Sequence, residues 1–279
     1  MGKLVEKLQQ VSQGSSSVGF LGPRKPTQAP RPAALLVSLG ADEGTTAEAA
    51  AKNGADVLIV TDWQPGGDLS KVQSALAASG AIWGVEYAAA RSSDGALKLA
   101  QEAGASFAVI GQSASAHMLF EELETFDLVV EVPIPKDDLG LLLLRMENLL
   151  PAQVALLRTR LASADLASMT VADYARLRLV SEALRFPVLL TLAEVPEMAH
   201  VRTLVRLGVS GLVLPGTGLT AERLGTQVKS LREQLEKTPA RDEDRSPVAI
   251  GGLMEAGGQS LAPRTPRREP SPGPEPDEE

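Results

Sequence analysis

The sequence predicts a (β/α)8 barrel, in which eight parallel strands alternate with eight helices. Eight short apolar runs, rich in branched residues, alternate along the chain with eight stretches of helical periodicity. Four of the helical stretches also end in a glycine followed at once by an apolar run, at Gly54, Gly80, Gly104 and Gly208. Helices commonly end at a residue with positive φ, which glycine adopts without strain. The repeated junction is therefore typical of a helix that turns directly into a buried strand.

The strands are expected at 34–39, 56–61, 82–86, 107–110, 128–132, 154–158, 188–192 and 211–214. The helices between and after them are expected at 46–52, 69–78, 94–102, 116–124, 138–149, 171–184, 197–206 and 220–237. No hairpin signal separates the strands, which favours a parallel sheet, and eight is the number of strands at which such a sheet closes.

Two alternatives remain open at this level. Residues 139–144 can form a strand while 154–158 extend a helix, because apolar runs of this length do not separate the two by periodicity. An open doubly wound sheet is the competing architecture, but no Gly-x-Gly-x-x-Gly motif follows the first strand.

Composition divides the chain into three parts. Residues 33–238 carry the barrel pattern. Residues 1–32 are expected to be an arm, with a short amphipathic helix followed by a flexible stretch rich in Gly, Ser and Pro. Residues 239–279 are rich in Pro, Gly and Glu, which predicts a disordered acidic tail.

The helix of the arm, expected at 2–13, places Leu4, Val5, Leu8 and Val11 on one face. This face is expected to cap the bottom of the barrel or to dock on a protein partner. Contact with a membrane surface is the alternative, and it would be weak because three helical turns with two lysines bind bilayers poorly.

Composition also limits the class of protein. The chain has 279 residues, no Cys, a formal net charge of −8 and 3% aromatic residues. Disulfides and Cys-ligated metals are therefore excluded, and nucleic acid is an unfavourable partner. No signal peptide is expected, because the first twenty residues lack a continuous apolar segment, and no apolar run approaches the roughly 20 residues that a membrane helix needs. A cytoplasmic protein without a transmembrane segment is expected.

Candidate site residues lie where strands end, because a βα barrel assembles its site from the carboxyl ends of its strands. Asp62, Glu86, Glu131 and Glu194 are carboxylates at such positions. Each alone is most simply a solvated or Arg-paired group, but together they can act as a general base or hold Mg2+. Glu86 and Glu131 are the favoured catalytic residues, since each follows an apolar strand without a turn residue between. Glu86, Glu131 and Asp62 are the expected metal ligands, and Mg2+ is the one candidate cofactor.

Arg158 is the third expected catalytic residue. It alternates with Arg160 at the end of the sixth strand, so only one of the two faces the barrel interior. An inward Arg158 would either pair with Glu131 from the neighbouring strand or bind an anionic substrate.

The loop Gly216-Thr217-Gly218 joins the last strand to the last helix. Free backbone N–H groups and the helix dipole converge at such a loop, which predicts a binding site for phosphate or another anion. The alternative is an ordinary loop with Thr220 as the helix N-cap. No matching Gly-rich turn follows the seventh strand.

The eight units, the repeated glycine junctions and the segment Gly208-Val209-Ser210-Gly211-Leu212-Val213-Leu214-Pro215-Gly216 together resemble the aldolase-type TIM-barrel superfamily, including its phosphate-binding synthases and lyases. The resemblance covers about residues 33–237 and concerns architecture. No catalytic lysine on the sixth strand, histidine base on a strand or second phosphate loop can be matched.

Two functions are therefore carried forward. The first is a lyase-, isomerase- or synthase-like enzyme acting on a small anionic metabolite that is phosphorylated or carboxylated. Glu86 or Glu131 would be its base or Mg2+ ligand, Arg158 its anion clamp and Gly216–Gly218 its anion loop. The second is a non-catalytic barrel that serves as a binding or assembly module. Carboxylates and an arginine converging in an open pocket at the carboxyl ends of the strands favour the enzyme. An apolar or filled barrel end favours the module.

Overall fold

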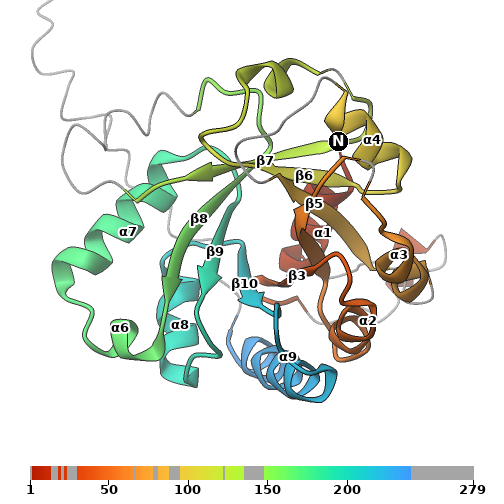
Figure 1. Ribbon diagram of the computed structural model, residues 1–279. Helices are drawn as coiled ribbons and strands as arrows, with labels where there is room; N and C mark the ends of the chain where they lie inside the picture. The colour runs from red at the N-terminus through yellow and green to blue at the C-terminus, as the bar shows by residue number, and fades with distance from the viewer. Residues whose placement is uncertain are drawn as a thin grey trace, which may run out of the picture. The chain divides into compact units, whose positions relative to one another are not determined.

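Eight parallel strands close into a barrel in the order β10-β3-β4-β5-β6-β7-β8-β9, with the helices outside (Figure 1). This computed structural model describes residues 2–13, 18–19, 22–23, 30–65, 67–77, 81–87, 95–121, 123–134 and 148–239. The tail expected at 239–279, apart from its first residue, lies outside these residues, as does the helix expected at 138–149 apart from residues 148 and 149, which form a turn. The closed barrel confirms the predicted fold class and removes the open sheet as an alternative.

The barrel strands are β3 (Ala34–Gly40), β4 (Val57–Trp63), β5 (Ile82–Tyr87), β6 (Phe107–Ile110), β7 (Asp127–Val132), β8 (Val154–Leu161), β9 (Val188–Leu192) and β10 (Gly211–Pro215). A separate antiparallel pair joins β1 (Val18–Gly19) to β2 (Gly22–Pro23). Every expected barrel strand is present to within a few residues. Because 154–158 belong to β8, the alternative in which they extend a helix is wrong.

The described helices are α1 (Lys3–Gln13), α2 (Gly44–Lys52), α3 (Ser70–Ala77), α4 (Ala96–Glu102), η1 (Ala116–Phe120), α6 (Ser163–Ala167), α7 (Val171–Ala183), α8 (Met198–Arg206) and α9 (Ala221–Glu236). The α-helix expected over 116–124 is wrong, since η1 is a five-residue 3-10 turn. Glu121 is already extended, and Thr125 has a φ of 60° where the chain turns into β7. The short helix α6 was not expected.

The glycine junctions have the backbone conformation that the sequence predicts. Gly54, Gly104 and Gly208 have φ values of 99°, 95° and 89°. Each follows a helix and leads directly into β4, β6 or β10. The fourth junction, at Gly80, lies outside the described residues.

The interior of the barrel is filled by side chains from alternate strand residues, as expected for a period of two. Phe107 on β6 is fully buried and occupies the space beside Gly84 on β5. A Cβ atom at Gly84 would lie 2.4 Å from the carbonyl oxygen of Phe107 and 2.6 Å from its ring. The absence of a side chain on β5 at this level therefore makes room for the phenylalanine.

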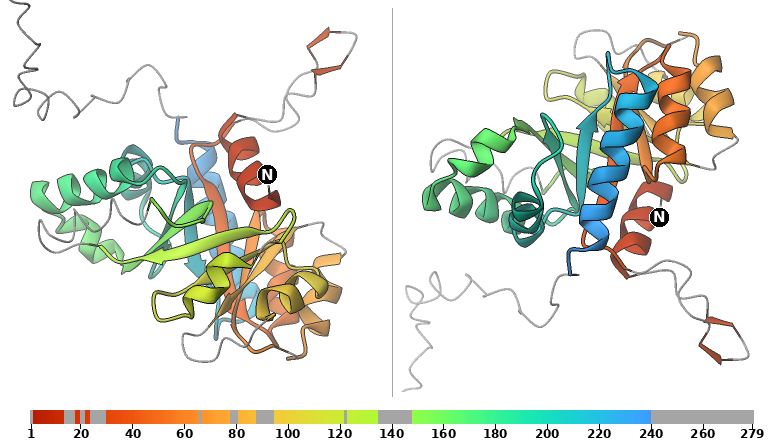
Figure 2. Two further views of the ribbon diagram at one scale, coloured as in Figure 1. Left: turned by 90° about the horizontal axis from the view of Figure 1, so that it is seen from above. Right: turned by 90° about the horizontal axis from the view of Figure 1, so that it is seen from below.

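Helix α1 closes the end of the barrel at which the strands begin (Figure 2). Its buried residues Leu4, Val5, Leu8 and Val11 pack against the interior strand residues. The prediction that this helix caps the barrel is confirmed. The apolar face of α1 is buried within the chain. In this fold it is not available for the alternative, contact with a membrane surface.

Asp127, the first residue of β7, holds the start of α1. Its carboxylate accepts the backbone N–H groups of Leu4 and Val5 at 2.9 and 3.2 Å, and the residue is 1% exposed. A negative group at a helix N-terminus is favourable because it meets unpaired N–H groups and the positive end of the dipole. Burial raises the pKa of Asp127 above its ordinary value of 3.8, and the N–H groups of Val5 and Leu4 partly oppose that shift.

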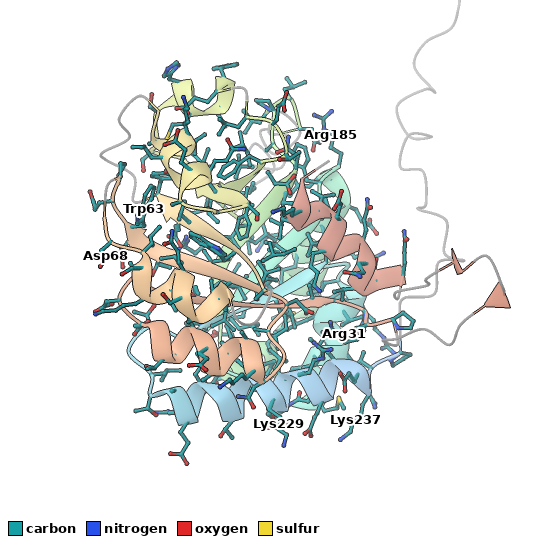
Figure 3. The ribbon with its side chains drawn as sticks, turned by 90° about the vertical axis from the view of Figure 1, so that its right-hand side faces the viewer. Arg31, Trp63, Asp68, Arg185, Lys229 and Lys237 are labelled. Atoms are coloured by element: carbon teal, nitrogen blue, oxygen red, sulfur yellow. The ribbon has the colours of Figure 1, made fainter. Side chains whose placement is uncertain are left out.

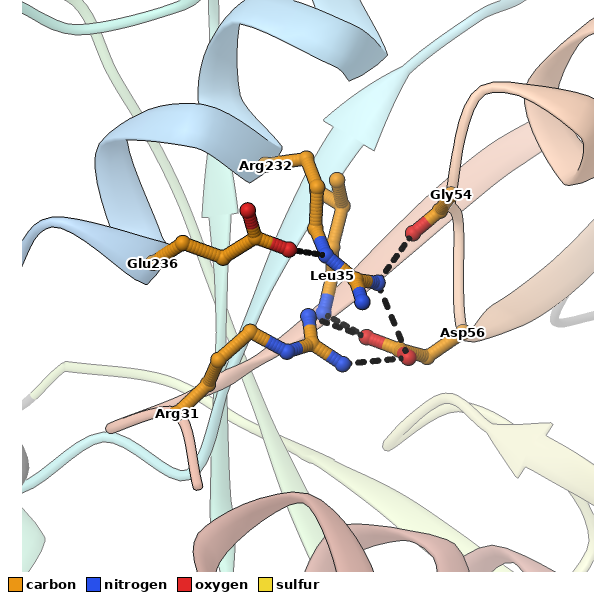
Figure 4. A network of polar contacts seen from close by, with 6 residues as sticks. All are labelled: Arg31, Leu35, Gly54, Asp56, Arg232 and Glu236. Atoms are coloured by element: carbon orange, nitrogen blue, oxygen red, sulfur yellow. Dashed lines mark hydrogen bonds and ion pairs between the residues drawn. The ribbon is translucent and has the colours of Figure 1, made fainter. Parts of the chain in front are cut away.

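Arg31 anchors the chain between the arm and β3 (Figure 4). Its guanidinium donates two hydrogen bonds to the carboxylate of Asp56, at 3.0 and 2.7 Å, and the side chain is 2% exposed. Asp56 also accepts the N–H of Leu35 at 2.9 Å, and Arg232 on α9 lies 3.5 Å from the same carboxylate. Arg31 was expected in a flexible arm, but it is part of the packed body.

The outer face of α9 contrasts with this buried network. Arg31 lies among the packed elements, whereas Lys229 and Lys237 project from α9 into solvent (Figure 3).

All described residues belong to one compact unit, Met1–Arg241. None of the helices among them has the length and apolar character required to cross a membrane.

Candidate functional site

The open end of the barrel, called the mouth here, is formed by the carboxyl ends of the strands. Counting in steps of two from the buried interior residues Gly84, Val129 and Leu156 leads to Glu86 on β5, Glu131 on β7 and Arg158 on β8. The same count on neighbouring strands gives Ser38, Thr61 and Thr191. These residues therefore form the uppermost interior layer, at the position where barrels of this class assemble their sites.

Arg158 reaches two carboxylates across the mouth. Its Nη2 donates to Glu86 Oε1 at 2.6 Å, and its Nε lies 3.2 Å from Glu131 Oε1. The second contact is an ion pair without hydrogen-bond geometry, and the Nε atom is buried with no hydrogen-bond partner. The three side chains are 28%, 19% and 30% exposed for Arg158, Glu86 and Glu131. The cluster is thus half-buried and open to a ligand.

Two cavities meet at this cluster. The larger has a volume of about 470 Å³ and extends from Glu86 and Arg158 toward Ser38, Thr61 and Thr191. The smaller, of about 350 Å³, lies between Arg158 and the residues Tyr87, Gln112, Ser113 and Glu131. Glu86 and Arg158 line both cavities, so the ion pair is the wall between them. Cavities of this size hold small metabolites.

Gly111 makes room for the carboxylate of Glu131. It follows β6 and lies on the inward side of the barrel, between the strands that carry Glu86 and Glu131. A Cβ atom there would lie 3.4 Å from Glu131 Oε2. The strand between the two glutamates therefore contributes space rather than a side chain.

Asp62 lies at the edge of the larger cavity in an unusual backbone conformation. Its φ is 57°, and the pairing of β4 with β5 shifts register between Val60 and Trp63. Its side chain is exposed and lines the cavity with Glu86 and Arg158. Left-handed non-glycine residues are uncommon and concentrate at functional sites.

Tyr87 belongs to the smaller cavity but its hydroxyl is already used. The hydroxyl donates to the carbonyl oxygen of Ala96, and the ring packs edge-on against Trp63 with centroids 5.5 Å apart. Burial, and then the charge of Glu121, raise the pKa of Tyr87 above its ordinary value of 10. Tyr87 is therefore a neutral structural wall of the cavity.

Comparison with solved structures identifies the fold. A thiamine phosphate pyrophosphorylase from Pyrococcus furiosus matches with a TM-score of 0.53 and 13% identity, over 74% of this chain and 96% of its own. A mutant tryptophan synthase α-subunit from the same organism matches with a TM-score of 0.56 and 13% identity, over 73% and 98%. A protein from Aquifex aeolicus matches with a TM-score of 0.57 and 14% identity, over 84% and 99%. The chain has the aldolase-type TIM-barrel fold. No protein-family model and no curated protein matches it.

In the predicted anion loop, the N–H groups of Gly216 and Gly218 donate to acceptors of the protein itself. The N–H of Gly216 donates to the carbonyl oxygen of Ser38 at 2.6 Å, and the N–H of Gly218 donates to Glu43 Oε1 at 2.8 Å. Thr217 is exposed and lines the larger cavity. Thr220 caps α9 by accepting the N–H of Arg223, as the alternative interpretation of this loop expected. Anion binding by Gly216, Thr217 and Gly218 stays a prediction.

The predicted metal ligands are brought to the mouth without forming a closed metal centre. Arg158, a cation, lies between Glu86 and Glu131, and Asp62 lies across the larger cavity. Among the residues that the structure describes, no group of three or more His, Asp or Glu side chains is arranged to hold a metal ion. A Mg2+ ion here would have one or two carboxylate ligands and keep several waters.

Sequence reasoning missed two features of the mouth. Thr61 follows Ile59 by two residues on an apolar strand, so the period of two could have placed it inside the barrel. Glu43 is not among the expected site residues, and its contact with Gly218 joins loops 175 positions apart. No local pattern signals that contact. Glu194, expected at the mouth, is exposed and lies outside both cavity linings.

Proposed function

We propose that the mouth is the active site of a lyase-, isomerase- or synthase-like enzyme that acts on a small anionic metabolite. The observation that carries the proposal is the Arg158 side chain, half-buried between Glu86 and Glu131 and shared by two cavities. A guanidinium binds carboxylate or phosphate in planar fork geometry, and a carboxylate within reach of a carbon can act as a general base. Polar convergence at an open mouth also favours an enzyme over a non-catalytic module.

Charge at the mouth suggests how the ligand binds. Among the described residues that line the two cavities, Asp62, Glu86 and Glu131 are acidic and Arg158 is basic, which gives a formal charge of −2. An anionic ligand therefore binds by replacing a glutamate on Arg158, or together with a cation. Partly exposed ion pairs contribute little, about 1 kcal/mol or less, so this exchange is energetically accessible.

The exchange would prepare the base. When the anionic group of the metabolite pairs with Arg158, Glu86 loses its hydrogen-bond donor and becomes free to accept a proton from carbon. In the proposed step the C–H bond breaks, Glu86 takes the proton, and the electron pair moves toward an adjacent carbonyl of the substrate. Returning the proton completes an isomerisation or exchange cycle. Glu131 keeps Arg158 in place on the other side.

The test combines binding with proton exchange. Short keto acids, hydroxy acids and sugar phosphates are screened by calorimetry, and binding compounds are incubated with the protein in D2O and followed by NMR. We expect saturable binding that Arg158→Ala removes, and deuterium incorporation next to the carbonyl that Glu86→Gln slows by about 10²–10⁴-fold. Binding of an anion without any exchange would overturn the enzyme in favour of a binding module, and no binding would overturn both.

A further inference from the structure

Glu43 joins the first and the last loop of the mouth. It lies between β3 and α2, and its two carboxylate oxygens accept different backbone N–H groups. Oε2 accepts from Gly40 at 2.7 Å, and Oε1 accepts from Gly218 at 2.8 Å in the loop before α9. Because β3 and β10 are hydrogen-bonded neighbours, this contact crosses the seam at which the barrel closes.

Glu43 contacts the loop at which barrels of this class frequently hold phosphate. The loop after the eighth barrel strand and the start of the following helix supply the N–H donors for that purpose. Here one of those donors, Gly218 N–H, already meets an oxygen of a carboxylate. Hydrogen bonds with one charged partner are short and roughly twice as strong as neutral ones. The side chain of Glu43 thus stands where a ligand phosphate oxygen would stand.

The contact is not required to satisfy a buried donor. Gly218 is exposed, and an added Cβ atom there would have no heavy atom within 4 Å. Water could therefore accept its N–H. The carboxylate also makes no side-chain cap for α2, although Glu43 is the N-cap residue of that helix. The hydrogen bond from Gly218 is therefore not explained by helix capping or by the need to satisfy a buried donor, and a role in selectivity is open to test.

We infer that Glu43 is a specificity-determining residue that keeps phosphate groups out of the mouth. A phosphate bound at this loop would have to displace a carboxylate, or bring its negative charge beside one, and like charges in contact repel each other. The inference rests on the proposed function and narrows its substrate class: the metabolite is a small carboxylate that pairs with Arg158 and carries no phosphate group.

The experiment compares Glu43→Ala and Glu43→Gln with Glu48→Ala, which changes an exposed glutamate on the same helix. Inorganic phosphate, sulfate and malonate are titrated at constant ionic strength, with calorimetry and the unfolding midpoint as readouts. For the wild type we expect saturable malonate binding and no saturable phosphate binding. Glu43→Ala should gain saturable phosphate binding, with a Kd at least about tenfold below the highest phosphate concentration at which the wild type shows no saturation, through removal of the like charge. Glu48→Ala should behave as wild type.

Each outcome separates the two proposals. A merely structural role would lower the unfolding midpoint in both Glu43 variants without changing its dependence on phosphate, and that result overturns the inference. Saturable phosphate binding by the wild type also overturns it. If Glu43→Ala does not fold, Glu43→Gln decides, since the amide keeps one acceptor oxygen and removes the charge. If the wild type binds neither malonate nor any anion of the earlier screen while Glu43→Ala gains phosphate binding, the proposed function is overturned and the role of Glu43 in excluding phosphate stands.

Discussion

The Nη2 atom of Arg158 lies 2.6 Å from Oε1 of Glu86, although the two residues belong to strands β8 and β5, which are not neighbours in the barrel. The pair therefore spans the mouth rather than one edge of the sheet. The 28% and 19% exposure of the two side chains means that water screens the pair and a ligand can reach it. The arrangement connects ligand binding by the arginine to release of the carboxylate.

Glu86→Gln is the first variant that tests this relationship. We expect the free energy of unfolding to fall by no more than about 1 kcal/mol, because the pair is partly exposed. Affinity for malonate should rise, since Arg158 loses a competing charge, while deuterium exchange into a bound keto acid falls. Denaturant titration, calorimetry and NMR measure the three quantities. A large loss of stability together with weaker malonate binding would instead make Glu86 a structural partner of Arg158.

Mg2+ is the second test of the mouth. Two carboxylates there face one guanidinium, so a divalent cation that binds only the folded chain should raise the unfolding midpoint at millimolar concentration. The double variant Glu86→Gln, Glu131→Gln should lose that shift, and Ca2+ serves as a comparison cation. An equal shift in the double variant would place any Mg2+ elsewhere, and no shift in the wild type would remove Mg2+ from the proposal.

Asp62 is the third. Its φ of 57° costs a non-glycine residue about 1–3 kcal/mol, with Asp toward the low end, while glycine loses about 0.5–1 kcal/mol of chain entropy instead. Asp62→Gly should therefore leave stability unchanged or raise it by about 1 kcal/mol, and weaken Mg2+ or substrate binding. Asp62→Ala removes the same carboxylate but keeps the backbone strain, so it should be less stable than Asp62→Gly in denaturant titrations. The reverse order would mean that the chain entropy of glycine outweighs the strain of the left-handed backbone at this position.

The fourth prediction concerns the buried ion pair of Asp56 with Arg31, at the opposite end of the barrel. Asp56→Ala leaves Arg31, which is 2% exposed, without its two hydrogen-bond acceptors. Breaking a buried pair in this way costs about 3–5 kcal/mol of unfolding free energy. Glu48→Ala is the matched control, because its pair with Lys52 is exposed and is worth about 0.5 kcal/mol or less. Similar losses in both variants would show that Arg31 finds another partner.

Much of the barrel could be predicted from sequence because its signals are local. A glycine with positive φ at the end of a helix, as at Gly54, and a short apolar run after it are both visible within a few residues. The period of two then places Glu86 and Glu131 inside the barrel once the strands are known. Where the local signal was ambiguous the prediction was wrong, as over 116–124, in which apolar residues favoured a helix and a five-residue 3-10 turn formed.

Contacts between distant segments could not be predicted in the same way. In the sequence, Arg31 is one of several basic residues in a Pro-rich arm, and nothing nearby indicates a partner for it. Only the closed fold places it against Asp56 and the start of β3. Pairing of Arg158 with Glu131 was one of two alternatives, but its stronger contact with Glu86 required knowing that both side chains face the barrel axis. The carboxylate of Glu43 at Gly218 depends on which loops meet at the seam.

The last prediction concerns pH and the helix at the bottom of the barrel. Burial raises the pKa of Asp127 in the folded chain above its ordinary value of 3.8, so the folded chain holds this proton more tightly than the unfolded chain. The group therefore contributes stability that is fully present below pH 3.8 and is lost as pH rises through the raised pKa. Asp127→Asn cannot titrate and still offers an oxygen to the N–H groups of Leu4 and Val5.

The difference in unfolding free energy, wild type minus Asp127→Asn, should fall as pH rises from the ordinary carboxyl pKa and become constant above the raised one. Subtracting the variant removes the contribution of all other carboxylates, which denaturant titrations of the wild type alone would mix together. Hydrogen exchange at the amides of Leu4 and Val5 should become faster over the same pH interval, by more than the intrinsic increase of exchange with pH. The reason is that ionisation of buried Asp127 favours local opening of α1 from the barrel. A difference that rises with pH would mean that the N–H groups outweigh burial and hold Asp127 as the anion.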